Sequence, residues 1–241
     1  MQQQQPVRRY NNIRMKSVSL KDMTRRDSQM NEDRVMIFID GSNLYHSLKK
    51  FFNRVDIDMG KFCEKLLGRR RLIRIYYYNA KVGRREEPER YKDQQTFFAS
   101  VGAVPYTELR LGHLVYNNWP STPPYEKGVD VQLATDLLTH SFKNNYDTAI
   151  LVAGDNDYVG ALQAVKDNGK HVEVALFGKE RTSRQLREVA DRIISMDGRF
   201  LRGCWKNQVA PGRNIGRNTN INVSNRVTEK SEAPKGVASE P

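Results

Sequence analysis

The 241-residue sequence contains no long apolar run and only two cysteines. No stretch approaches the roughly 20 apolar residues that a membrane-spanning helix needs, so we expect no membrane segment. The amino terminus has no apolar core behind its charges, and we therefore expect no secretory signal. Cys63 and Cys204 lie far apart in the sequence. They fit reduced thiols in a cytoplasmic protein better than a disulfide framework.

Several common catalytic signatures are also missing. The four histidines do not have the spacing of metal ligands, and Ser42 and Ser47 have no evident His/Asp partners for a nucleophilic triad. The glycines of "DGSN" and "AGDND" match neither a dinucleotide fingerprint nor a P-loop. These absences disfavour a zinc site, a serine hydrolase and a nucleotide-cofactor fold.

The sequence is strongly basic, with 40 Lys and Arg against 28 Asp and Glu and a net charge of +12. A positive surface attracts polyanions, nucleic acid above all, through phosphate neutralisation and counterion release. The two ends, residues 1–33 and 204–241, are polar segments without an apolar period, so we predict basic, disordered tails. About half of the excess charge belongs to the predicted folded domain, residues 34–203.

Between the tails, apolar runs of strand length alternate with segments of helical period. Strands are predicted at 34–40, 71–80, 103–112, 146–154, 170–178 and 192–196. Helices are predicted at 42–52, 58–68, 87–102, 129–145, 157–169 and 183–192. The Pro-rich segment 117–128 is predicted to be a loop. This alternation predicts a three-layer α/β fold with a mostly parallel central sheet.

Four aspartates fall where such a sheet can bring them together. Asp40 ends the first strand, and Asp155 and Asp157 directly follow the strand "AILVAG". Asp130 opens the helix after the Pro-rich segment and can reach the same edge of the sheet, where ligands of parallel sheets bind. Gathered carboxylates repel one another unless a cation neutralises them. Hard oxygen ligands favour Mg²⁺ or Mn²⁺ over zinc.

Each of these aspartates also has a local, structural interpretation. Asp40 can form an Asx-turn, and Asp130 can be a first-turn acid favoured by the helix dipole. Asp155 or Asp157 can cap the helix that follows. Local capping accounts for one acid per helix, but it does not account for a Gly-Asp-x-Asp turn.

The polar neighbours of these aspartates carry weaker signals. Asn43 can hydrogen-bond Asp40 or a phosphate, or it can cap the first helical turn. Lys127 can contact phosphate, although a solvated loop lysine is the simpler interpretation. Asp136 lies six residues after Asp130 and off its helical face, which favours a surface or supporting role.

Three motifs, in this order, resemble the NYN domain family, the LabA-like (DUF88) branch of the PIN-like nuclease superfamily. They are "VMIFIDGSNLY" (35–45), "KGVDVQLATDLL" (127–138) and "TAILVAGDNDYVGALQAVKDNGKHVEV" (148–174). The resemblance spans roughly residues 34–197 and implies a PIN-like Rossmannoid α/β fold with a metal-dependent ribonuclease site. The family's acidic positions fall on Asp40, Asp130, Asp155 and Asp157, and its other polar positions fall on Asn43, Lys127 and Asp136.

We therefore predict a Mg²⁺- or Mn²⁺-dependent ribonuclease whose metals activate water for attack on an RNA phosphodiester. The predicted roles are catalysis and metal binding by Asp40, Asp130, Asp155 and Asp157, substrate binding by Asn43 and Lys127, and support by Asp136 and Ser42. Arg84 and Arg85 can steer the RNA backbone, and aromatic residues such as Tyr45 can stack on unpaired bases.

Two other functions are compatible with the same residues. One is an RNA-binding or regulatory module that keeps the fold but cleaves little or not at all. The other is a phosphatase-like hydrolase, which is disfavoured because Ser42 stands where that reaction needs a second acid. We expect RNA as the partner and no membrane, and a homo-oligomer stays open.

Overall fold

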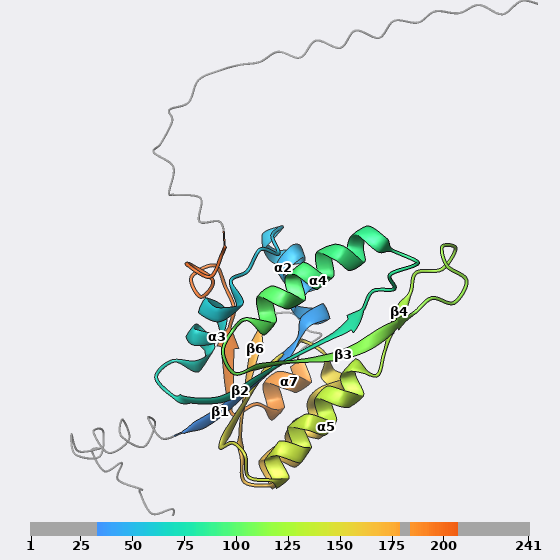
Figure 1. Cartoon of the computed structure of the whole chain (residues 1–241). Helices are drawn as coiled ribbons and strands as arrows, with labels where there is room; N and C mark the ends of the chain where they lie inside the picture. Colours follow the sequence, from blue (N-terminus) through green and yellow to red (C-terminus); the bar gives the residue numbers. More distant parts are fainter. Residues whose placement is uncertain (1–32, 179–183, 207–241) are drawn as a thin grey trace, which may run out of the picture. The chain divides into compact units, whose positions relative to one another are not determined.

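A computed structural model of the chain describes residues 33–178 and 184–206 (Figure 1). The strands are Arg34–Asp40 (β1), Arg71–Lys81 (β2), Thr107–Val115 (β3), Tyr125–Lys127 (β4), Thr148–Val152 (β5), His171–Leu176 (β6) and Arg192–Ser195 (β7). The helices are Gly41–Phe52 (α2), Met59–Leu67 (α3), Pro88–Gly102 (α4), Val129–Phe142 (α5), Val159–Asp167 (α6) and Arg184–Val189 (α7), with a 3₁₀ turn at Asn156–Tyr158 (η1). None of the helices in the described part is long and apolar enough to cross a membrane.

The strands form one seven-stranded sheet in the order β4-β3-β2-β1-β5-β6-β7. Every neighbouring pair is parallel except β3 and β4, which are antiparallel. The predicted α/β class and the mostly parallel sheet are confirmed. β1 is central, so its last residue lies between the ends of β2 and β5.

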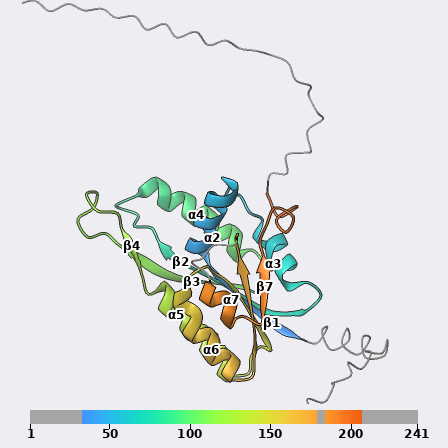
Figure 2. The same ribbon diagram turned by 180° about the vertical axis from the view of Figure 1, so that it is seen from behind.

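Alternating side chains of β1 build two separate cores, one on each face of the sheet. Val35, Ile37 and Ile39 pack with side chains of α2, α3 and α4. Met36 and Phe38 pack with side chains of α5, α6 and α7 on the other face (Figures 1 and 2). A strand that is apolar on both sides is typical of a parallel sheet covered by helices on both faces.

Local sequence signals set the bounds of α3, and the chain end packs beside its start. The Asp58 carboxylate caps α3 by accepting a hydrogen bond from the Lys61 N–H at 3.2 Å, and Gly68 ends the helix with a φ of 64°. Ile57 pairs with Trp205, and Cys204 is fully buried. The chain therefore stays packed through residue 206, three residues past the predicted domain end, while the rest of both predicted tails lies outside the described residues.

Two predicted boundaries are corrected around β3. The strand occupies Thr107–Val115 rather than 103–112, because Pro105 and Tyr106, whose φ is 60°, form a turn before it. The predicted loop 117–128 contains the short strand β4 at its end. β4 begins directly after Pro124, the last proline of this segment. It pairs with β3 and lies at the edge of the sheet, so it needs backbone partners on one side only.

Candidate active site

The end of β1 is tied to the end of β5 by the first turn of α2. Asp40 is the N-cap of α2, and its Oδ1 accepts a hydrogen bond from the Asn43 N–H at 2.9 Å. The Asn43 Oδ1 accepts a second hydrogen bond from the Gly154 N–H at 3.0 Å. Gly41 must follow Asp40 without a side chain, because a Cβ there would lie 2.3 Å from the ring of Tyr77. The sequence "DGSN" thus holds two strand ends together.

The Gly-Asp-x-Asp turn after β5 divides its two acids between different positions. Asp155 caps η1, with its Oδ1 accepting the Asp157 N–H at 3.0 Å, and its side chain also faces the site described below. Asp157 lies inside η1 and its side chain is exposed. Capping and a place in the site are therefore compatible for Asp155.

A single tyrosine hydroxyl joins two of the predicted acids. The Tyr158 Oη lies 2.8 Å from Asp130 Oδ1 and 3.1 Å from Asp40 Oδ2, and the Tyr158 side chain is buried. A phenol carries one proton, so it can donate to only one of the two carboxylates at a time. The pair of carboxylates is therefore short of hydrogen-bond donors.

The burial of Asp40 makes this shortage costly. Burial is the main reason that the pKa of Asp40 is raised to about 6, and the negative charges of Asp130 and Glu126 contribute to the same rise. The hydrogen bonds from the Asn43 N–H and the Tyr158 hydroxyl act in the opposite direction without offsetting the burial. A bound cation would favour the ionised form of Asp40.

These residues surround an open depression of about 330 Å³ at the carboxyl edge of the sheet, which we call the acidic depression. Four carboxylates line it: Asp40, Asp130, Asp155 and Glu126. Ser42, Asn43 and His46 from α2 line it as well, and Lys50 borders it. Within residues 33–178 and 184–206, and leaving Lys50 aside, no Lys or Arg forms an ion pair with any of the four carboxylates.

Three predicted residues are not among those that line this depression. Lys127 is exposed on β4, where its backbone pairs with His113. Asp136 lies further along α5, where its Oδ2 accepts a hydrogen bond from the Tyr78 hydroxyl at 2.9 Å and lies 3.3 Å from Arg110 Nε. Neither side chain is among those that line the acidic depression. Asp157 is not among them either.

The structure adds two residues that sequence reasoning missed. Glu126 reaches the depression because β4 pairs antiparallel to β3, with Glu126 opposite Leu114. In the sequence it stands in a predicted loop beside Lys127, and only its charge was a signal. Tyr158 resembles an ordinary core aromatic of the helix after β5, and nothing in its spacing indicates that its hydroxyl reaches two acids.

The donor atoms of the acidic depression fit a hard divalent cation. They are carboxylate, amide and hydroxyl oxygens, with one imidazole from His46 and no thiol. In the part of the chain that the structure describes, no three His, Cys, Asp or Glu side chains form a group that could hold a metal as they stand. Mg²⁺ commonly uses only one or two protein carboxylates and keeps several waters, so the donor set still fits it.

The fold and this depression define a PIN-like α/β domain with an acidic hollow at the carboxyl edge of a parallel sheet. Residues 34–197 match the model of the NYN domain. Because the match covers most of the chain, this protein belongs to the NYN domain family, a nuclease-like family. The predicted LabA-like membership is confirmed.

The relatives are distant. An uncharacterized protein of Methanocaldococcus jannaschii is 26% identical over 187 residues, covering 78% of this chain and only 65% of its own length. The low amplitude and bright protein LabA of Synechococcus elongatus is 22% identical over 179 residues, covering 68% of this chain and 84% of its own. A solved structure of a protein of unknown function from Vibrio parahaemolyticus shares the fold, with a TM-score of 0.54 and 19% identity over 70% of this chain and 95% of that one.

Proposed function

We propose that this protein is a Mg²⁺- or Mn²⁺-dependent ribonuclease that hydrolyses RNA phosphodiester bonds at the acidic depression. The observation that carries the proposal is the set of four carboxylates that line one depression, of which Asp40 is buried. Membership of a nuclease-like family supports the class of reaction. A buried carboxylate such as Asp40, beside other acids at a ligand-binding edge, is costly for the fold and is typical of functional sites.

Asp40, Asp130 and Asp155 would hold the cation, and the cation would activate water and stabilise charge on the leaving oxygen. Tyr158 orients Asp40 and Asp130 through its shared hydroxyl. Glu126 is exposed at the margin of the depression, and its carboxylate can accept the proton of the attacking water.

The other predicted residues take roles around this centre. Asn43 positions Asp40 and the end of β5 through the two hydrogen bonds already described. Asp136 acts through the fold, because its contacts to β2 and β3 hold the helix that carries Asp130. The role predicted for Asp157 stays a prediction. Exposed Lys127 is proposed to contact phosphate.

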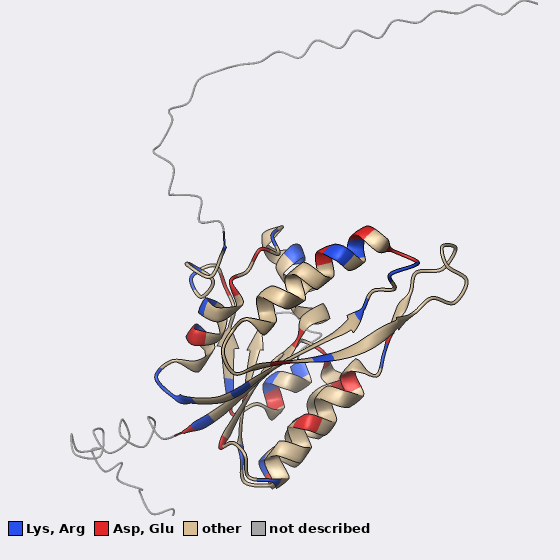
Figure 3. Ribbon diagram, viewed as in Figure 1, with Lys and Arg blue, Asp and Glu red and all other residues tan. Residues whose placement is uncertain are grey.

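Positive charge near the carboxyl edge supports an RNA substrate. Arg84 and Arg85 lie on the loop between β2 and α4, which is blue at these two positions and red at the glutamates that follow them (Figure 3). Among the described residues, neither forms an ion pair, so both are available to phosphates.

Cys63 and Cys204 are free, buried thiols, which fits the reducing cytoplasm that we propose as the location.

An RNA-binding module with little cleavage is a second candidate, and one observation favours it. The Tyr158 hydroxyl already lies between Asp40 and Asp130, and no group of three metal-binding side chains stands ready among the described residues. If the hydroxyl keeps this place when RNA is present, the protein would bind RNA without a complete metal site.

Incubation of the purified full chain with end-labelled single-stranded and structured RNA, with Mn²⁺ or with EDTA, separates the two candidates. We expect cleavage that requires Mn²⁺. Asp40→Asn and Asp155→Asn should each lower the cleavage rate at least about 100-fold. Asp147→Asn is the matched control, because Asp147 is ion-paired at the opposite edge of the sheet. RNA that is bound and never cut would leave the binding module as the function, and uncut, unbound RNA would refute both.

A further inference from the structure

A second hollow opens beside the acidic depression, bounded by α2, the end of β2 and α4. Its volume is about 440 Å³, within the range of pockets that hold small organic ligands. Ser42, His46 and Glu126 line both this hollow and the acidic depression. Because the two hollows adjoin at these residues, a ligand bound over the carboxylates can extend into the second hollow.

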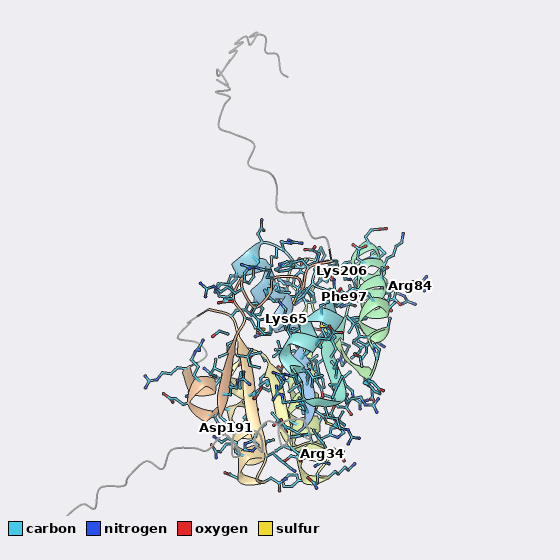
Figure 4. The ribbon with its side chains drawn as sticks, turned by 90° about the vertical axis from the view of Figure 1, so that its left-hand side faces the viewer. Arg34, Lys65, Arg84, Phe97, Asp191 and Lys206 are labelled. Atoms are coloured by element: carbon cyan, nitrogen blue, oxygen red, sulfur yellow. The ribbon has the colours of Figure 1, made fainter. Side chains whose placement is uncertain are left out.

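The walls of this hollow are largely apolar and aromatic. Tyr77 and Phe97 form part of the interior, with their ring centroids 5.8 Å apart. Phe97 is further fixed by Lys206, whose Nζ lies 6.0 Å from the ring centroid (Figure 4). Tyr45, at 45% exposure, is the most exposed of the described tyrosine and phenylalanine side chains that line the hollow, and its ring meets that of His46 in a T-shaped contact with centroids 5.4 Å apart. A flat ring entering the hollow can stack on Tyr45.

Two side-chain amides line the hollow, and only one is already satisfied. The Gln94 Nε2 donates to the Ala80 carbonyl at 2.9 Å, and its Oε1 accepts from the Val82 N–H at 2.9 Å. Among the described residues, Asn79 makes one side-chain contact, from its Nδ2 to the Tyr77 Oη at 3.5 Å, which is too long for a strong hydrogen bond. Asn79 thus offers a donor and an acceptor to a ligand.

We propose that this hollow, the base pocket, receives one unpaired nucleobase of the RNA whose phosphate lies at the acidic depression. The inference rests on the proposed function. A nucleobase combines a flat ring that stacks on tyrosine with edges that pair with an amide, and Tyr45 and Asn79 supply these two partners. Arg84 lies beside α4 (Figure 4), on the loop that leads into this helix. From there, Arg84 and Arg85 would contact the phosphate backbone of the same RNA.

Binding of a labelled eight-nucleotide RNA tests the base pocket apart from cleavage. The full chain carries Asp130→Asn so that the RNA stays intact in Mn²⁺, and fluorescence anisotropy compares the RNA with an abasic ribose-phosphate oligomer of equal length. We expect the RNA to bind about tenfold more tightly than the abasic oligomer. Tyr45→Ala should remove most of this difference and leave the abasic oligomer unaffected.

Matched variants separate pocket effects from general damage. Tyr106→Ala replaces another exposed tyrosine, which lies just before the start of β3 and does not line the base pocket. It should change neither the affinity for RNA nor the affinity for the abasic oligomer. Val55 is exposed at the pocket, so Val55→Trp should fill it and weaken RNA binding at least about fivefold, whereas Val55→Ala should not. Asn79→Leu should bring the affinities for A, C and U octamers within about twofold of one another.

The outcomes distinguish this inference from the proposed function. Equal affinity for RNA and abasic oligomer, or equal behaviour of Tyr45→Ala and Tyr106→Ala, would overturn the base pocket, even if the parent chain cuts RNA. Duplex RNA with the same sensitivity to Tyr45→Ala would also overturn it, since paired bases cannot enter. A parent chain that never cuts RNA refutes the proposed function, while base-dependent binding lost in Tyr45→Ala still supports the pocket.

Discussion

At the amino edge of the sheet, where the strands begin, acidic side chains are matched with cations. Asp147 Oδ1 lies 2.7 Å from Arg34 Nη2, and Glu173 Oε1 lies 3.0 Å from Arg70 Nη1. Arg34 and Asp191 lie at this end of the molecule, and Arg84 lies towards the other (Figure 4). At the carboxyl edge, Asp40, Asp130, Asp155 and Glu126 line one depression, and no described Lys or Arg other than Lys50 lies in that lining.

One acid at each edge shows this contrast, because their pKa values are shifted in opposite directions. The hydrogen bond from Arg34 lowers the pKa of Asp147, whereas burial raises the pKa of Asp40. Pairing at the amino edge serves the fold, because each carboxylate there compensates a cation. At the carboxyl edge the ionised form of Asp40 destabilises the fold because the side chain is buried, and we infer that a ligand compensates its charge. Variants at the two edges should therefore fail in different ways.

The largest expected effect is loss of cleavage in Asp130→Asn. The change keeps the shape of the side chain and removes one charge from the acidic depression, so the rate should fall at least about 100-fold. Thermal denaturation should show the variant to be as stable as the parent in EDTA, since Asp40 loses a repelling neighbour. Asp147→Asn should be assayed well below its unfolding temperature. If it loses cleavage to the same extent, the claim that only the acids of the carboxyl edge take part in cleavage is wrong.

At the amino edge, Arg70→Met should damage stability and leave cleavage by the folded protein unchanged. Glu173 is only 8% exposed, and without Arg70 the one cation that still pairs with its charge among the described residues would be Arg192, whose Nη1 lies at 3.4 Å. Breaking a buried ion pair by removing one partner costs about 3 kcal/mol of unfolding free energy. Urea denaturation measures the loss, and a cleavage defect below the unfolding transition would contradict this assignment.

Two tyrosine hydroxyls allow a finer comparison. Tyr158→Phe removes the donor shared by Asp40 and Asp130, and Tyr78→Phe removes the donor to Asp136. Each should lower the unfolding free energy by about 1–2 kcal/mol in EDTA. Mn²⁺ should restore stability to Tyr158→Phe only, because a cation can replace the proton between the two carboxylates. Equal restoration of both variants would argue against metal binding at the depression.

The smallest effect concerns acid stability at the amino edge. The pKa of Asp147 is lower in the folded protein than in the unfolded chain. The stabilisation that Asp147 gives the fold is therefore fully present above the ordinary Asp pKa of about 3.9, and it is lost as the pH falls through the folded pKa. The ion pair is partly exposed, so Asp147→Asn should remove less than about 1 kcal/mol near neutral pH. Unfolding curves of parent and variant should converge on acidification, and a constant gap down to low pH would contradict the lowered pKa.

The sequence by itself determined the sheet, its edge and part of the site. Apolar residues on both sides of "VMIFI" require burial on both faces, and this predicts a parallel strand whose ligand edge lies at Asp40. The turn after "AILVAG" places Asp155 at the same edge by the same reasoning. These inferences succeed because the period and the end of a strand are local properties of the chain.

Only the tertiary structure decided which side chains meet. Glu126 enters the acidic depression through the antiparallel register of β4, and the Tyr158 hydroxyl reaches acids from β1 and α5. Asp136 is drawn instead into contacts with Tyr78 and Arg110. Such meetings depend on pairing and packing between segments far apart in the chain, which no local pattern encodes.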